Sequence, residues 1–130
     1  MRKEHLYAFA FISWMVFVTF SSLYSFEDDE IGHFNIPYAD KIVHFTFYFV
    51  AAILGSLFLI ETKKEKAILT KYLTILAFSL IFFGIIIEVI QGTITINRSG
   101  DVYDALANCI GVVLAIIGIL AIFYRQRGLK

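Results

Sequence analysis

Three groups of polar residues interrupt an otherwise apolar sequence, and their side chains could bind or transform a charged ligand. The groups are Asp40, Lys41 and His44; Glu88 and Gln91; and Arg98, Asp101, Asp104 and Asn108. Carboxylates and histidine can exchange protons, whereas lysine and arginine can hold a phosphate. Ionisable residues are costly inside a membrane and usually have a function there. We therefore take all nine as candidate binding residues.

A division of labour follows from the side-chain chemistry. Arg98 would hold a phosphate through paired donors, and Lys41 would hold it as a point charge. The candidates for acid–base catalysis are His44, Glu88 and Asp104. Because the sequence contains no nucleophile motif, it does not decide between binding and catalysis, and it implies no particular cofactor.

The elements that would position these residues are apolar helices. The chain has 130 residues, of which 59% are hydrophobic, well above the share in an ordinary soluble domain. Four stretches approach the roughly 20 residues needed to cross a membrane. They predict an all-α fold, a four-helix transmembrane bundle with helices at about 6–26, 42–60, 72–90 and 105–124. We expect a single integral membrane domain over residues 1–130.

The basic residues are distributed unevenly along the chain. Nine of the eleven lie in the N-terminus, between the second and third helices, or in the C-terminus, and the other two are Lys41 and Arg98. The positive-inside rule then predicts a multi-pass protein of the cell membrane with both termini in the cytoplasm. The three polar groups would consequently meet at the extracytoplasmic face, on the same side as the acidic run 27–30.

Helical spacing places several of these residues on shared faces. Asp40, His44 and Tyr48 recur every four residues and so share one face. A second stripe, with spacings of three and four, contains Asp104, Asn108, Gly111, Ala115 and Gly118. Its inner part is a small-residue seam, which lets membrane helices pack closely. We expect the seam to contact another helix, and it also allows a helix-mediated oligomer.

Other interpretations remain open at this point. The charges could form an ion-pair network that only fixes helix packing, with Asp40 and Asp104 as ordinary first-turn acids. A divalent-cation site built from His44, Glu88, Asp101 and Asp104 is a further alternative, but no HExxH-type spacing is present and we assign no metal ligands. Nucleic-acid binding is not expected, because the sequence predicts no exposed basic face.

The same residues resemble a known family of membrane proteins. Residues 40–45 (DKIVHF), followed by Tyr48, are similar to the second-helix motif of VanZ-like proteins, and residues 88–91, Arg98 and residues 104–111 resemble the second motif block. The resemblance implies a four-helix membrane protein, in a family named for a protein linked to teicoplanin resistance. Family members often carry a proline between the glutamine and the arginine, and residues 93–97 contain none.

Residues and resemblance together lead to one functional hypothesis. We expect the polar site to bind or modify a membrane lipid or a lipid-linked cell-envelope molecule, with a link to glycopeptide resistance. The alternative is a structural or interaction protein whose charges only hold the helices in register.

Overall fold

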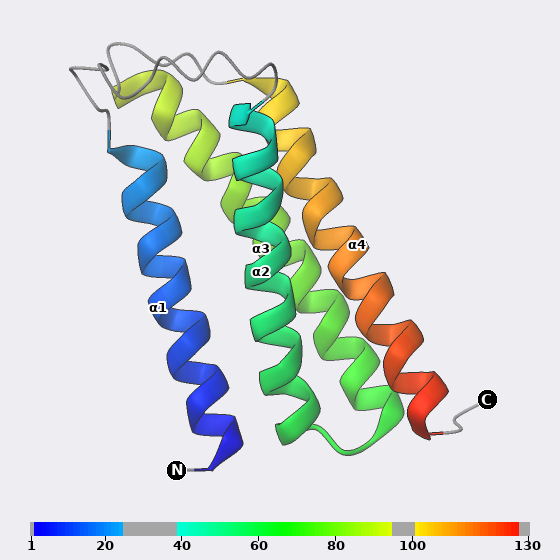
Figure 1. The fold of residues 1–130 in the computed structure, drawn as a ribbon. Helices are drawn as coiled ribbons and strands as arrows, with labels where there is room; N and C mark the ends of the chain where they lie inside the picture. Colours follow the sequence, from blue (N-terminus) through cyan, green and yellow to red (C-terminus); the bar gives the residue numbers. More distant parts are fainter. Residues whose placement is uncertain (1, 25–38, 95–100, 128–130) are drawn as a thin grey trace.

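Four helices form the protein, and no strand occurs among the residues that the computed structural model describes, which are 2–24, 39–94 and 101–127. The helices are α1 (Lys3–Leu23), α2 (Ala39–Thr62), α3 (Lys66–Ile94) and α4 (Val102–Arg127) (Figure 1). Each contains a segment long and apolar enough to cross a membrane. The predicted four-helix transmembrane fold is confirmed.

The helices extend beyond the apolar stretches that predicted them. α2 begins at Ala39, so Asp40 and Lys41 lie in its first turn, and α3 begins at Lys66, several residues before the predicted start. Backbone groups must be hydrogen-bonded within the helix only at membrane depth, so these additional polar turns lie toward the membrane surface. Long charged side chains near the ends can reach the interface. The polar residues therefore belong to the helices.

The bundle has two ends of different character. α1 begins and α4 ends at one of them, which we call the lysine end because Lys63, Lys64, Lys66 and Lys71 lie there (Figure 1). At the other, the polar end, α2 begins, α3 ends and α4 begins. The cytoplasmic location of the lysine end stays a prediction from the charge distribution.

α2 packs most extensively against α4, although α3 separates them in the sequence. A Cβ atom at Gly111 would lie 2.5 Å from the backbone oxygen of Phe45, so only glycine allows this approach. Ala115, one turn further along, is buried as well. At these two positions the small residues of α4 meet the rest of the bundle as expected.

The prediction that Gly118 contacts another helix was wrong. A Cβ atom there would meet no neighbouring atom within 4 Å. Larger side chains, including Ile116 and Phe123, join the core in this half of α4. The close approach of α2 and α4 is therefore confined to the half near the polar end.

α1 is the most peripheral helix and packs against α2 and, to a lesser extent, α3. The Trp14 indole donates a hydrogen bond of 2.8 Å to the backbone oxygen of Phe47. On a different face of α1 runs an apolar groove of about 640 Å³, lined by residues of α1 and by Phe83 of α3. Leu23 and Tyr24 line it at the end of α1, next in sequence to the buried Ser22.

Candidate functional site

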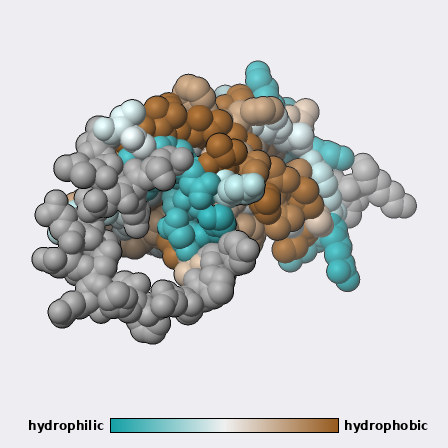
Figure 2. Space-filling model, turned by 90° about the horizontal axis from the view of Figure 1, so that it is seen from above, coloured by the Kyte–Doolittle hydropathy of each residue, from teal (hydrophilic) through white to brown (hydrophobic). Residues whose placement is uncertain are grey.

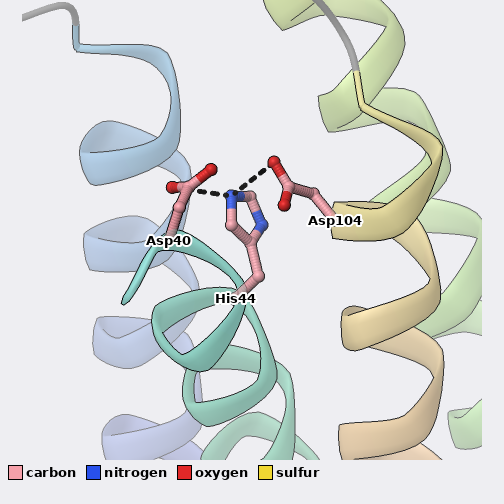
Figure 3. Close-up of side chains that lie close together, drawn as sticks. All are labelled: Asp40, His44 and Asp104. Carbon is pink, nitrogen blue, oxygen red and sulfur yellow. Dashed lines mark ion pairs between the residues drawn. The ribbon is translucent and has the colours of Figure 1, made fainter. Parts of the chain in front are cut away.

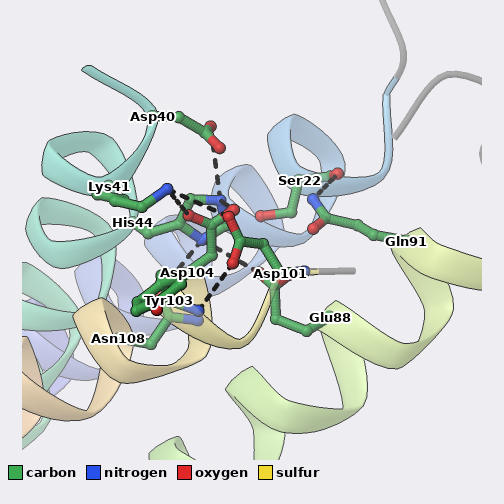
Figure 4. Close-up of polar contacts among 10 residues, drawn as sticks. All are labelled: Ser22, Asp40, Lys41, His44, Glu88, Gln91, Asp101, Tyr103, Asp104 and Asn108. Carbon is green, nitrogen blue, oxygen red and sulfur yellow. Dashed lines mark hydrogen bonds and ion pairs between the residues drawn. The ribbon is translucent and has the colours of Figure 1, made fainter. Parts of the chain in front are cut away.

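Most of the candidate residues gather at the polar end. Viewed onto this end, hydrophilic residues form a patch bordered by apolar ones (Figure 2). We call the following set the polar cluster: Asp40, Lys41 and His44 of α2, Glu88 of α3, Asp101 just before α4, and Asp104 and Asn108 of α4 (Figure 4). His44, Glu88, Asp104 and Asn108 are buried. Residues far apart in the sequence are thus brought together inside the bundle.

His44 lies at the centre of the polar cluster. Its Nδ1 atom is 3.2 Å from Oδ1 of Asn108 and 3.3 Å from Oε1 of Glu88. Its Nε2 atom is 3.7 Å from Oδ1 of Asp40 and 3.7 Å from Oδ2 of Asp104 (Figure 3). Both ring nitrogens therefore face oxygen atoms, and these oxygens come from α2, α3 and α4.

Lys41 joins α2 to the start of α4. Its Nζ atom lies 3.2 Å from Oδ2 of Asp101 and 3.4 Å from Oδ1 of Asp104. The side chain is 31% exposed, so one side of the ammonium group faces the surface of the polar end. A lysine that only reached for the interface would have no such partners. The structure thus places this cation between two carboxylates.

Asp101 organises the beginning of α4. Its backbone oxygen accepts hydrogen bonds from the backbone N–H groups of Asp104 and Ala105, and its side chain accepts one of 2.8 Å from the N–H of Tyr103. This backbone donor, followed by the neighbouring Lys41, lowers the pKa of the Asp101 carboxyl below its ordinary value. The Asp101 N–H in turn donates to Oε2 of Glu88, at 3.4 Å. The helix start is therefore tied to α3.

Gln91 is buried near the end of α3 and contacts α1. Its side-chain amide donates a hydrogen bond to the backbone oxygen of Ser22, which links α3 to α1 (Figure 4). Sequence reasoning missed Ser22, because a backbone oxygen leaves no signal in the residue type. Arg98 and the acidic run 27–30 lie outside the described residues, so their predicted places at this site are not tested.

Gly84 is a second residue that the sequence reasoning missed. A Cβ atom at this position would lie 3.1 Å from the Tyr48 ring and 3.2 Å from Nδ2 of Asn108. Glycine therefore leaves room for Tyr48 and Asn108 beneath His44. A single glycine within the apolar run 81–87 was the available signal, since glycine in a helix often marks a close approach.

Acidic groups outnumber basic ones in the polar cluster. The described residues contribute four carboxylates, from Asp40, Glu88, Asp101 and Asp104, and one lysine. Buried charges are costly unless they are paired. Besides Lys41, only His44 in this set can become positively charged. The arrangement can therefore exchange protons and attract a positively charged partner.

Four apolar helices with a buried polar cluster at one end define a multi-pass membrane protein. The model of the VanZ/LLP1 family matches residues 4–124, so the chain belongs to this family and the predicted resemblance is confirmed. No curated protein and no solved structure matches the chain.

Proposed function

We propose that the polar cluster binds the headgroup of a membrane lipid or a lipid-linked cell-envelope molecule at the extracytoplasmic face of the cell membrane. One observation carries this proposal: buried ionisable residues from three helices converge at one end of an apolar bundle. A protein that only spans a membrane does not require such residues, and their burial is costly. Their position near the end of the bundle fits a ligand at the membrane surface.

The apolar groove on α1 supports a ligand with a long apolar chain. Its lining residues face the hydrocarbon region if the bundle crosses the membrane as proposed, and it ends at Leu23 and Tyr24. The neighbouring Ser22 accepts the hydrogen bond from Gln91, one helical turn from Glu88. The groove runs along α1 and its end reaches the level of the polar cluster, an arrangement that matches a molecule with a charged head and an apolar tail.

Roles within the cluster follow from exposure and charge. Lys41 is the partly exposed cation of the described cluster, and because Asp101 and Asp104 already offset its charge, a phosphate bound there would need a second cation. The sequence adds Arg98 as a second phosphate ligand. His44, Glu88 and Asp104 could transfer protons if the ligand is also modified. Binding is the part that the geometry supports best, since any reaction would need a nucleophile from water or the ligand.

The second candidate function is structural. Lys41 contacts two carboxylates of the α4 start, and His44 contacts acids of three helices. Such a network could fix the register of the helices without binding a ligand. In that case, folded protein and cellular phenotype should decline together whenever the network is broken.

Substitutions that spare packing separate the two candidates. We expect His44→Gln, which keeps hydrogen-bonding capacity, and Arg98→Lys, which keeps the charge, to alter the envelope lipid profile and teicoplanin susceptibility while folded yield stays normal. His5→Gln, at the lysine end, is the matched control and should change nothing. A phenotype that appears only when folded yield falls would favour the structural function.

A further inference from the structure

Asp40, His44 and Asp104 form a group whose ligand atoms all lie within 4.8 Å of one another (Figure 3). Nε2 of His44 is 3.7 Å from an oxygen of each aspartate. That separation exceeds the roughly 2.7–3.2 Å of an ordinary N–H···O hydrogen bond. Two ligand atoms bound tetrahedrally to one ion at about 2.1 Å lie about 3.4 Å apart, close to the observed separation.

The opposite nitrogen of the same ring supplies an independent observation. Nδ1 lies beside Oδ1 of Asn108 and Oε1 of Glu88, and the Glu88 oxygen is buried without a hydrogen bond from any described residue. Two oxygen acceptors at Nδ1 favour a proton there, so in the neutral ring the Nε2 lone pair is directed at the aspartates. A metal-bound histidine typically has this partner arrangement, with a carboxylate or carbonyl behind the ring.

The charges around the His44 ring also favour a bound cation at Nε2. A neutral His44 would direct a lone pair at two carboxylates, and Lys41 offsets only part of the acidic excess because it contacts Oδ1 of Asp104 on one side. The other oxygen of Asp104, Oδ2, is the one that faces His44. A cation between Nε2 and the aspartates would remove this repulsion without displacing the lysine.

We propose that Asp40, His44 and Asp104 bind one divalent transition-metal ion, Zn²⁺ or Mn²⁺, with Glu88 and Asn108 orienting the histidine from behind. This set differs from the sequence-based alternative, because Glu88 lies behind the ring and Asp101 pairs with Lys41. The proposal rests on the ring geometry and not on the proposed headgroup binding.

The donor atoms select the kind of ion. Imidazole nitrogen suits Zn²⁺ and related ions, whereas carboxylate oxygens also suit Mn²⁺, and an all-oxygen set would favour Mg²⁺ or Ca²⁺. The Asp40 side chain is 56% exposed, so the group opens toward the surface of the polar end. Three protein ligands with an open position are typical of sites that also bind water or a ligand oxygen. A phosphate could occupy that position.

Metal binding by the purified full chain tests the proposal. The detergent-solubilised protein is stripped with a chelator, titrated with Zn²⁺ or Mn²⁺, and analysed for bound metal after equilibrium dialysis. We expect saturation at one ion per chain, and loss of that ion in His44→Gln and Asp104→Asn. Glu88→Gln should keep the stoichiometry and weaken the affinity by about 10–100-fold, as expected of a group behind the ligand.

Two further variants keep the test decisive. Asp40→Asn changes an exposed ligand, so it should fold normally and lose the ion even if the buried substitutions prevent folding. His5→Gln should bind like the wild type. Absence of saturable binding by the wild-type chain would overturn the proposal, as would equal binding by the wild type, Asp40→Asn and His44→Gln. No lipid is present, so either result leaves the headgroup proposal to its own experiment.

Discussion

The two ends of the bundle use the same residue types in opposite ways. At the polar end, Lys41 contacts two carboxylates and the His44 side chain is only 5% exposed. At the lysine end, the His5 side chain is 67% exposed and Lys64 is exposed. Lys63 lies over the ring of Tyr72, 4.5 Å from its centroid, in a contact at the protein surface.

The difference lies in the direction of the side chains relative to the neighbouring helices. Outward-facing lysines can contact lipid headgroups and need no particular protein partner. Inward-facing charges need partners from other helices, so the loss of one leaves another buried and unpaired. Position within the bundle, more than residue type, therefore decides which charged residues matter for folding and binding.

The largest expected difference between the ends is accessibility from outside the cell, because it is all or none. In a Cys109→Ala background, Asp29→Cys should react with a membrane-impermeant thiol reagent on intact cells, and Lys64→Cys should not. Labelling of permeabilised cells is the control, and both cysteines should react there. Reaction at Lys64→Cys alone in intact cells would reverse the orientation and place the polar cluster in the cytoplasm.

His44 and His5 should differ strongly in their effect on stability. His44→Leu removes the group that faces the Asp40, Glu88 and Asp104 carboxylates, so we expect a loss of about 3–5 kcal/mol of unfolding free energy. His5→Leu changes an exposed side chain and should cost less than about 0.5 kcal/mol. Unfolding in detergent micelles, with chelator present, measures both. Similar losses would contradict the distinction between the ends.

Two glycines of α4 extend the comparison along one helix. Gly111→Ala would place a methyl group against the backbone of α2, and we expect a loss of about 1–3 kcal/mol. Gly118→Ala meets no neighbour and should be neutral or slightly stabilising, because alanine favours helix more than glycine does. Folded yield and unfolding midpoints report the sign of each change. Equal tolerance would show that α2 and α4 can separate near the polar end without cost.

The smallest expected difference in stability is between substitutions of Lys41 and Lys64. Lys41→Met removes the contacts with Asp101 and Asp104, which should lower stability slightly at low salt and less at high salt, since screening weakens partly exposed ion pairs. Lys64→Met should have no measurable effect at either ionic strength. A salt-independent loss in Lys41→Met would indicate that the lysine stabilises through packing of its aliphatic chain.

Much of the fold and of the polar cluster could be predicted from the sequence, because the sequence gives the charges and the helical spacing of the residues directly. The four spans followed from apolar length, and the meeting of Asp40, His44 and Asp104 followed from helical spacing together with the topology. Spacing could not show which ring nitrogen faces which acid, because that depends on the rotation and depth of three helices. The prediction of close helix contact along the small-residue seam was right at Gly111 and wrong at Gly118. Residue size alone does not reveal where two helices diverge.

Hydrogen-bond partners in the backbone could not be predicted from the sequence either. The carbonyl of Ser22 accepts the hydrogen bond from Gln91, and the carbonyl of Phe47 accepts the one from Trp14. Every residue has such an oxygen, so the sequence does not single these out. Both contacts bind α1 to the other helices, and the position of α1 was accordingly the least predictable part of the bundle.

The pairing of α2 with α4, across the intervening α3, has a consequence for synthesis. α4 follows α2 and α3 in the chain, so Asp104 and Asn108 enter the membrane after His44 and Glu88. Until the last helix inserts, the early helices carry exposed polar groups, a state that insertion machinery or membrane proteases can recognise. The site is therefore complete only once α4 has inserted, and a protein truncated before α4 would leave His44 and Glu88 without Asp104 and Asn108.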